Sequence, residues 1–433
     1  MPTTLNVALL GAGTVGAEVA RILTEGAASL TARSGARLQL SAVVVRDTAK
    51  DRGEFIPAEL ITDDAEAAVD GADIVVELMG GLEPAGTLIR RALRAGTSVV
   101  TGNKALLAAQ GAELFPLAAE HNALLSYEAA VAGAIPILRP LAESLAGDQV
   151  TQVMGIVNGS TNYILDRMDR EGAELAEVMD EASRLGYLEA DPSADVEGHD
   201  AAAKAALLAT LAFGAGFSID QVHTEGITQV SAGDVAAARE ADQVIKLLAI
   251  VERSEAGVQM RVHPTLISRE HPLAAVHGAF NAVFVTARNA GELMFYGQGA
   301  GGAPTASAVM GDLVMAARHV VDQLPVPAAG AAGSIPALSI ADAVTRYALQ
   351  IHVTDTAGVL ARIAGSFAEH GVSIEAMRQT AVPGDAGNQA GATATLRIVT
   401  HAATQRALDA TLAAVRDLDV VTSITSVLRV EGN

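Results

Sequence analysis

Asp200 and Lys204 lie four residues apart in the segment GHDAAAK (residues 198–204), so their side chains share one face of a helix. The residues that follow Lys204 are apolar on every side of that helix, which predicts that the helix is buried. Its few charged side chains are then not ordinary solvent-exposed ones. A buried lysine has a lowered pKa, and such an amine can both donate and accept a proton. A surface ion pair is the ordinary explanation of this spacing, but the predicted burial favours proton-transfer chemistry.

Lys104 is a second candidate for chemistry. It follows an apolar strand (residues 98–101) in the sequence TGNK, at the carboxyl edge where parallel sheets place their ligands. A solvated lysine at the start of a helix would have the same spacing, and both interpretations stay open.

A glycine turn joins the first predicted strand (residues 6–10) to the first predicted helix (residues 17–23). Glycines at 11, 13 and 16 allow a tight turn, close approach of a pyrophosphate and close packing of helix on strand. An ordinary glycine turn is the alternative, but the position between a strand and a helix favours dinucleotide binding.

The second strand of this series (residues 38–45) ends next to Arg46 and Asp47. Arg46 can hold the 2′-phosphate of NADP, whereas Asp47 can hold the 2′-hydroxyl of NAD. The distance along the chain from the glycine turn is long because residues 26–37 are expected to form an extra loop. We favour NADP slightly over NAD.

Glu128 is a solitary carboxylate in an apolar loop (residues 127–136). One carboxylate with backbone carbonyls suits a hard monovalent or divalent cation, although Glu128 can equally cap a helix. The ten histidines have no spacing typical of a zinc site.

Composition excludes several classes of function. The chain of 433 residues has 29 Lys and Arg against 50 Asp and Glu, a net charge of −21, which repels nucleic acid and anionic membranes. Without cysteine there are no disulfides, thiolate nucleophiles or Cys-ligated metals. The longest apolar run (residues 205–219) is too short to span a membrane, and the N-terminus lacks the charged region of a secretory signal. We expect a cytoplasmic protein.

The order of elements predicts three units. Short strands that alternate with helices indicate a parallel sheet for residues 1–136, completed by a helix at residues 304–324. An α+β unit follows at residues 137–303. After a linker rich in Ala, Gly and Pro (residues 325–340), residues 341–433 have the βαββαβ order of a ferredoxin-like fold.

Several long motifs make the chain resemble the homoserine dehydrogenases that carry a C-terminal ACT-type regulatory domain. The resemblance covers nearly the whole chain and includes the turn at residues 11–16. The other motifs lie at residues 102–107, 127–129, 158–165, 186–192 and 297–308. It implies an α/β chain with a Rossmann-type nucleotide-binding domain, an α+β domain for catalysis and dimerisation, and a ferredoxin-like ACT domain.

The resemblance implies reversible, NAD(P)-dependent reduction of L-aspartate 4-semialdehyde to L-homoserine, a step towards threonine, methionine and isoleucine. Lys204 would be the general acid, and the base in the reverse direction. Glu189 and Asp200 would bind the amino group and the hydroxyl end of the substrate. Gly186 would lie between substrate and nicotinamide, and Lys104 would approach the cofactor and the reacting oxygen.

The same resemblance assigns binding residues for the cofactor and for a monovalent cation, Na or K. Those for the cofactor are Gly11, Gly13, Thr14, Val15, Gly16, Arg46, Lys104, Gly186 and Gly301. Those for the cation are Glu128 and the carbonyls of Val131, Gly133 and Ile135.

In the C-terminal unit, the segment DTAGV (residues 355–359) is similar to the effector loop of ACT domains. Asp355, Gly358 and Val359 would therefore hold an amino-acid effector, which the resemblance suggests is L-threonine. A dimerisation domain that has lost its ligand is the alternative. Pairing of the middle domains and of ACT sheets would give a homodimer or homotetramer.

Two other functions fit part of the pattern. A non-catalytic amino-acid sensor could use the nucleotide fold as a signal, but the intact Lys204, Asp200 and Glu189 argue against it. Another NAD(P) reductase acting on an amino-acid-derived aldehyde or imine is the alternative within enzymes.

Overall fold

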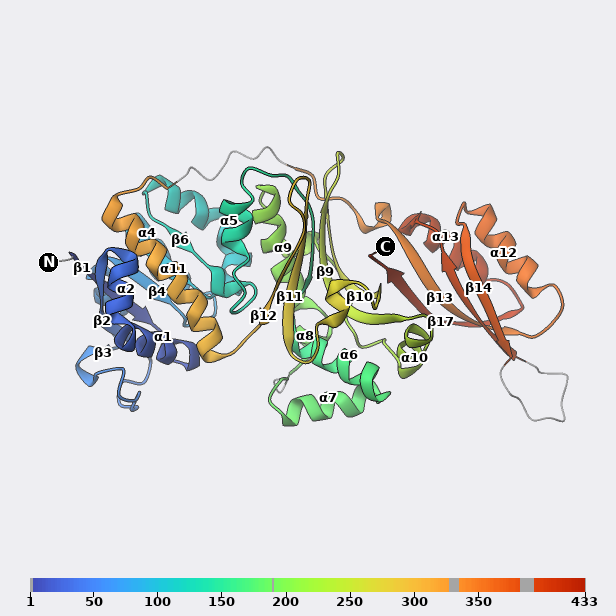
Figure 1. Cartoon of the computed structure of the whole chain (residues 1–433), viewed down its shortest axis with the longest axis horizontal. Helices are drawn as coiled ribbons and strands as arrows, with labels where there is room; N and C mark the ends of the chain where they lie inside the picture. The colour runs from blue at the N-terminus through green and yellow to red at the C-terminus, as the bar shows by residue number, and fades with distance from the viewer. Residues whose placement is uncertain (1–2, 189–190, 327–334, 382–392, 433) are drawn as a thin grey trace.

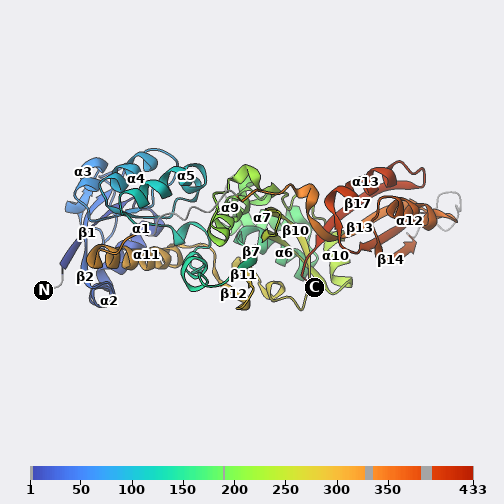
Figure 2. The same ribbon diagram turned by 90° about the horizontal axis from the view of Figure 1, so that it is seen from above.

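The computed structural model describes residues 3–188, 191–326, 335–381 and 393–432. Three units follow one another along the long axis, with the N-terminal unit at one end and the C-terminal unit at the other (Figure 1). The view from above shows the same succession (Figure 2).

The first unit is built on a six-stranded parallel sheet in the order β3-β2-β1-β4-β5-β6, which confirms the predicted parallel sheet. Its strands are β1 (Thr3–Leu10), β2 (Ala36–Val44), β3 (Ile61–Thr62), β4 (Ile74–Glu77), β5 (Ser98–Thr101) and β6 (Leu125–Ser126). The helices are α1 (Thr14–Glu25), α2 (Ala27–Ser34), α3 (Ala65–Asp70), α4 (Ala85–Arg94), α5 (Lys104–Glu120) and the short η1 (Ala58–Leu60) and η2 (Glu128–Ala130). Helices cover both faces of the sheet, so each face has its own apolar core.

Residues 26–37 correct one expectation, because they contain α2 rather than an extra loop. The helix lies between Gly26 and Gly35, and Gly35 ends it in the left-handed conformation with φ +79°. Glycine at both ends of a short polar segment is the pattern that we interpreted as a loop.

Helix α11 (Gly302–Asp322) returns from the middle of the chain to the first unit. Its buried residues, among them Val309 and Leu313, join the core that β1 and α1 form. In Figure 1 it is the orange helix among the blue N-terminal elements. The fold of the first unit therefore uses residues from two distant parts of the sequence.

The middle unit packs helices on a mainly antiparallel sheet in the order β12-β11-β7-β9-β10. Its strands are β7 (Val150–Ile156), β8 (His223–Thr224), β9 (Gln243–Arg253), β10 (Val258–Ser268), β11 (Phe280–Ala287) and β12 (Gly291–Gln298). The helices are α6 (Gly159–Glu171), α7 (Leu175–Arg184), α8 (Ser193–Val196), α9 (His199–Phe213) and α10 (Ala232–Glu240), with the short η3 (Pro140–Ser144), η4 (Ile219–Gln221) and η5 (Pro272–Ala275). As predicted, α9 is buried, and it packs on β9 and β10.

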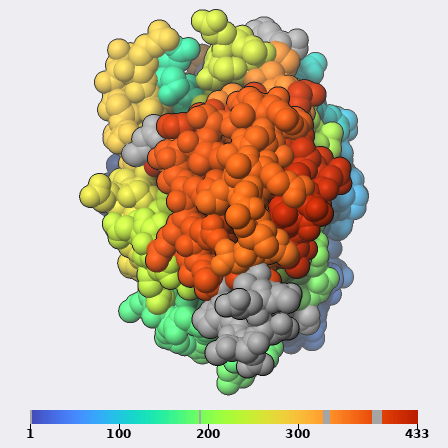
Figure 3. All heavy atoms as spheres, turned by 90° about the vertical axis from the view of Figure 1, so that its right-hand side faces the viewer, coloured from blue at the N-terminus to red at the C-terminus, as the bar shows by residue number. Residues whose placement is uncertain are grey.

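The C-terminal unit has the predicted βαββαβ order and the strand order β17-β13-β15-β14. It contains β13 (Val344–Thr354), α12 (Val359–Glu369), β14 (Ile374–Ala381), β15 (Thr393–Thr400), β16 (Ala403–Thr404), α13 (Gln405–Arg416), β17 (Val421–Val430) and the short η6 (Ile340–Asp342). This unit, orange and red, forms the near end of the molecule in Figure 3.

The C-terminal sheet is not separate from the middle one. The last strand, β17, pairs in parallel with β10 through Thr265↔Arg429 and Leu266↔Val430, so the described strands of both units form one continuous sheet. Part of the predicted linker (residues 327–334) lies outside the described residues. Beyond it, Leu338 N donates a hydrogen bond to Val258 O (2.8 Å), which holds the chain against β10 before the C-terminal unit begins. No described helix is both long and apolar enough to cross a membrane.

Candidate active site

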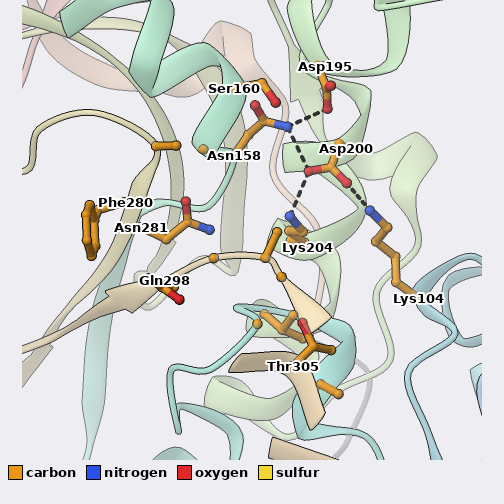
Figure 4. A pocket seen from close by; sticks show the side chains of 18 of the residues that line it. Lys104, Asn158, Ser160, Asp195, Asp200, Lys204, Phe280, Asn281, Gln298 and Thr305 are labelled. Atoms are coloured by element: carbon orange, nitrogen blue, oxygen red, sulfur yellow. Dashed lines mark hydrogen bonds and ion pairs between the residues drawn. The ribbon is translucent and has the colours of Figure 1, made fainter. Parts of the chain in front are cut away.

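A cavity of about 640 Å³ lies between the first and middle units. Its walls come from the end of β5 with the start of α5, from the start of α6, from residues 195–204 and from the loop before α11. Lys104, Asp200, Lys204, Gly186 and Gly301 all line it, so the fold brings together residues that are far apart in the sequence (Figure 4).

Asp200 links the two lysines. Lys204 Nζ donates to Asp200 Oδ2 (2.7 Å) and to the backbone oxygen of Val157 (2.6 Å). Lys104 Nζ donates to the other oxygen of the same carboxylate, Asp200 Oδ1 (Figure 4). An ammonium group has three N–H donors, and the third donor of Lys204 takes no partner in the part of the chain that the structure describes. It is available to a reacting oxygen.

Burial and charge set the protonation of this cluster. Lys204 is only 8% exposed, and this burial lowers the pKa of its amine. The Asp200 carboxylate opposes that shift, and the Lys104 ammonium adds to it. For Asp200, burial alone would raise the pKa, but the charges and hydrogen bonds of Lys204 and Lys104 hold it well below its usual range. Asp200 is therefore ionised, and Lys204 titrates below the ordinary range of a lysine.

Asn158 and Asp195 belong to the same cluster, and the sequence analysis assigned neither of them a role. Asn158 caps α6 through its side-chain oxygen, which accepts Thr161 N (2.9 Å). Its amide nitrogen then donates to Asp195 Oδ1 (2.6 Å) and to Asp200 Oδ2 (3.0 Å). Burial raises the pKa of Asp195. The helix-capping position of Asn158 was a usable signal, whereas nothing near Asp195 in the sequence marks its partner.

Gly186 and Tyr187 form another part of the cavity wall. Gly186 adopts φ +78°, a conformation that favours glycine, and Tyr187 O accepts a hydrogen bond from Ser160 Oγ (2.6 Å). Glu189, predicted to bind the substrate, lies outside the described residues.

A second cavity of about 800 Å³ lies over the carboxyl ends of β1 and β2. Gly11, Gly13, Arg46 and Asp47 line it, together with four more charged residues, Lys50, Arg52, Asp63 and Glu83. The Arg52 side chain connects two segments of the cavity wall, because it donates hydrogen bonds to Ala12 O (2.9 Å) and to Asp47 O (3.2 Å). Both ribose-binding candidates, Arg46 and Asp47, therefore line this cavity.

The glycine turn fits a dinucleotide. Gly11 has φ +99°, and a Cβ on it would lie 2.7 Å from Leu78 O; a Cβ on Gly16 would lie 2.2 Å from Gly11 O. Both positions therefore require glycine. A Cβ on Gly13 would meet open space, which leaves room for a pyrophosphate at the N-terminus of α1. Thr14 and Val15 form the first turn of this helix, where their backbone N–H groups face the same end.

The Glu128 carboxylate caps a chain segment, which is the alternative that the sequence left open. Its Oε1 accepts Ile137 N (2.6 Å) and Leu138 N (2.7 Å), and its Oε2 accepts Arg139 N and Arg139 Nε, both at 3.2 Å. These four bonds use both oxygens of the carboxylate to hold residues 137–139.

Backbone carbonyls nevertheless fit a cation at this loop. Within the described residues, the oxygens of Val131, Gly133 and Ile135 accept no hydrogen bond. Gly133 also lies in the wall of the cavity that holds Lys204, and a Cβ on it would lie 2.4 Å from Gly299 O. No cluster of three or more His, Cys, Asp or Glu suited to a metal is present in the described ranges.

The predicted effector residues lie at the start of α12. Gly358 caps the helix with φ +93°, and Asp355 Oδ1 accepts a hydrogen bond from Gln379 Nε2 of β14 (2.8 Å). Val359 is only 3% exposed and packs in the core of the C-terminal unit, so its side chain does not face a ligand. Only its backbone can contribute to a binding site.

Three family models match consecutive parts of the chain. They are the NAD-binding domain of homoserine dehydrogenase (residues 11–128), homoserine dehydrogenase itself (residues 136–314) and the ACT domain (residues 347–420). The homoserine dehydrogenase of Mycobacterium tuberculosis is 51% identical over 435 residues, covering 99% of this chain and 98% of its own. The chain belongs to the homoserine dehydrogenase family.

Solved homoserine dehydrogenases have the same fold. The enzyme from Thiobacillus denitrificans superposes with a TM-score of 0.92 at 38% identity, covering 100% of this chain and 99% of its own. A hyperthermophilic archaeal homoserine dehydrogenase mutant in complex with NADPH has a TM-score of 0.62 at 30% identity, covering 75% of this chain and 99% of its own. The chain is therefore an NAD(P)-dependent oxidoreductase that interconverts homoserine and aspartate semialdehyde, and it carries an ACT domain.

Proposed function

We propose that Lys204 is the general acid and base of the homoserine dehydrogenase reaction. The observation that carries this proposal is the shared Asp200 carboxylate, which holds two ammonium groups beside one cavity while leaving a donor of Lys204 unused. Bound NADPH or NADH supplies the hydride. As the aldehyde carbon accepts it, the carbonyl oxygen gains negative charge, and Lys204 stabilises that charge and transfers a proton to it.

The reverse direction uses the same groups with the opposite protonation. Neutral Lys204 accepts the hydroxyl proton of homoserine as the hydride leaves the carbon. Asp200, which is ionised in both directions, stabilises the ammonium that forms. Lys104 neutralises the second oxygen of Asp200 and adds positive charge near the reacting oxygen.

Asp195 and Asp200 provide carboxylates for the ammonium group of the substrate. Asp195 lines the cavity beside Asn158, and its Oδ2 accepts no hydrogen bond from the described residues. A carboxylate that receives a charge-assisted hydrogen bond from an ammonium suits this position. Glu189 is proposed as a further ligand of the substrate from its place in the motif at residues 186–192.

NADP is the proposed cofactor. Arg46, Lys50 and Arg52 line the second cavity, and a 2′-phosphate carries the charge that such side chains bind. Asp47 is the group that would favour the 2′-hydroxyl of NAD instead. Within residues 46–52, which follow β2, the cavity lining has three cationic side chains against one acidic one, and this local excess supports NADP.

A monovalent cation, Na or K, is proposed for the carbonyls of Val131, Gly133 and Ile135. Their unused acceptors support this, and a singly charged ion suits a set of neutral ligands. The role of the cation would be to stiffen the loop against residues 298–299 of the cavity wall.

L-Threonine is the proposed effector of the ACT domain, held near Asp355 and Gly358 in a homodimer or homotetramer. The N-terminus of α12 supports binding of the amino-acid carboxylate, and Asp355 can accept the ammonium. We propose the cytoplasm as the site of action, since a chain without cysteine has no requirement for an oxidising compartment.

The test is the initial rate of NADPH and NADH oxidation with aspartate semialdehyde, with and without L-threonine, for the wild type and for Lys204→Met. We expect Lys204→Met to lower kcat by about 10² to 10⁴-fold while the protein still binds NADPH, as general acid catalysis contributes that much. Lys246→Met is the matched control, because Lys246 is a second buried lysine of the middle unit that does not line the cavity. An equal loss in both variants would contradict the role of Lys204.

A further inference from the structure

Arg429, near the end of β17, forms a two-bond ion pair with the middle unit. Its Nη1 and Nη2 donate to the two oxygens of Glu225, at 2.8 and 2.9 Å. The arginine side chain is 7% exposed, and its Nε and Nη2 also donate to Gln405 Oε1 of α13. One guanidinium group therefore connects the last strand and the second helix of the ACT domain to the middle unit.

Glu225 is held from several sides. Burial alone would raise the pKa of its carboxyl, but hydrogen bonds from His223 and Arg429 hold that pKa well below its usual range. Its backbone N donates to Val262 O of β10 (2.7 Å), beside the point where β17 joins the same strand. The carboxylate is thus ionised and attached to both units.

The residues that follow Glu225 contact the backbone just before α9. Ile227 N donates to Val196 O (2.8 Å). A Cβ on Gly226 would lie 2.1 Å from Val196 O and 2.4 Å from Glu197 Cα, so the two segments touch with no intervening side chain. A movement of residues 225–227 must therefore displace residues 196–197.

The contacted residues, 196 and 197, lie in the sequence between the two proposed substrate carboxylates. Asp195 precedes the touched residues, and Asp200 follows them in the first turn of α9. Gly198, the N-cap of α9, adopts φ +86°, and a Cβ on it would lie 3.2 Å from Thr224 Cγ2 and 3.3 Å from Glu225 O. The segment 224–227 thus supports the turn that orients both carboxylates.

We propose that Arg429 is a positioning residue for the dehydrogenase site, and that its pair with Glu225 transmits displacements of the ACT domain to Asp195 and Asp200. The physical reason is that a buried guanidinium strongly resists separation from its carboxylate. When β17 shifts, Glu225 follows, and the turn at residues 196–198 shifts with it. The expected effect on kinetics rests on the proposed substrate contacts of Asp195 and Asp200. The structural link from Arg429 to residues 196–198 does not depend on them.

The test compares full-length Arg429→Met and Arg429→Lys with a matched control, Arg397→Met. Arg397 also pairs with the middle unit, through Glu240 of α10 (2.5 Å), but Glu240 has no hydrogen bond or ion pair with residues 195–200 in the described part of the chain. Amide hydrogen exchange of residues 195–204 measures the mechanical link without substrate or effector. Steady-state kinetics measures the consequence for the site.

We expect exchange at residues 195–200 to be about tenfold faster in Arg429→Met, near the wild-type rate in Arg397→Met, and intermediate in Arg429→Lys. KM for aspartate semialdehyde should rise about fivefold or more in Arg429→Met, with KM for NADPH within about twofold of the wild type. Faster exchange with unchanged kinetics would support the mechanical link and overturn the proposed substrate contacts.

Unchanged exchange at residues 195–200 in Arg429→Met would overturn the link itself. If Arg429→Met does not fold, Glu225→Gln breaks the same pair while it keeps the shape of the side chain. The two substitutions act on one interaction, so exchange in the double variant should be no faster than in Arg429→Met. Additive effects would contradict transmission through this pair.

Discussion

Lys104 and Lys204 contact opposite oxygens of one carboxylate, although Lys104 starts a helix of the nucleotide-binding unit and Lys204 lies inside the middle unit. The charged groups therefore join the two units across the cavity, and the contact with Asp200 orients the amine of Lys204.

The first prediction concerns the pH dependence of the two directions. Because burial lowers the pKa of Lys204 from its ordinary 10.5, the proposed acid loses its proton at a pH below that value. Reduction of aspartate semialdehyde needs the protonated amine, so its kcat should fall as pH rises through this pKa. Oxidation of homoserine needs the neutral amine, so its kcat should rise over the same range.

Asp200→Asn should shift both profiles to lower pH by about one unit or more, because it removes the negative charge that opposes deprotonation of Lys204. Profiles of kcat against pH for both directions, in both proteins, measure the shift. If the two kcat profiles shift in opposite directions, or do not shift, Lys204 is not the shared acid and base.

A second prediction concerns the substrate ammonium. Asp195→Asn should raise KM for aspartate semialdehyde about tenfold or more, since it replaces a charged acceptor by a neutral amide at a half-buried site. KM for NADPH should change little. Asp180→Asn, an equal charge change on the exposed surface of α7, serves as the control and should leave both constants unchanged.

The third prediction addresses cofactor preference. Arg46→Ala should raise KM for NADPH by about 10-fold or more and leave KM for NADH within about twofold, because only NADPH carries the 2′-phosphate. Arg37→Ala provides the comparison, since Arg37 is an exposed arginine at the opposite end of β2. Equal losses with both cofactors would place Arg46 away from the 2′ position.

Lys246 allows a prediction about stability. This lysine is 1% exposed, and its ammonium donates to Val276 O (2.6 Å) and Asn162 Oδ1 (3.0 Å). Lys246→Met should lower the free energy of unfolding at pH 7 by about 2 to 4 kcal/mol, because two buried acceptors lose a charged donor. Urea denaturation measures this difference.

The pH dependence of that difference has a definite sign. Burial lowers the pKa of Lys246 to about 8, although the charges of Asp166 and Asp169 partly oppose the shift. The unfolded chain then binds more protons than the folded one between about pH 8 and its ordinary pKa of 10.5, so Lys246 makes stability rise with pH in that window. The difference between wild type and Lys246→Met should grow with pH over this range, and a flat difference would contradict the lowered pKa.

Local spacing predicted some of the site and none of its long-range contacts. The pairing of Asp200 with Lys204 follows from their separation by one helical turn, and the burial of that helix follows from its apolar residues. The contact of Lys104 with Asp200 joins residues 96 positions apart, and no local pattern encodes it. Asp195 was missed for the same reason, because its partner Asn158 lies on another helix.

The fold was predictable where strands and helices alternate regularly along the chain. It was less predictable where single short contacts or short helices decide the structure. Alternating apolar strands and helices indicate the parallel sheet, and the βαββαβ order indicates the C-terminal unit. The pairing of β17 with β10 rests on only two residue pairs, so it leaves no periodic signal in the sequence. Helix α2 was missed because glycines at its ends resemble those of a loop.

The return of α11 to the first unit also has a consequence for synthesis on the ribosome. The sheet of the nucleotide-binding unit ends at Ser126, but the helix that completes one of its apolar cores ends at Asp322. The two points are separated by 196 residues, which take about 10 to 40 s to synthesise at about 5 to 20 residues per second. During that interval, the nascent sheet has one incompletely covered face, and the middle unit must emerge before the first can close.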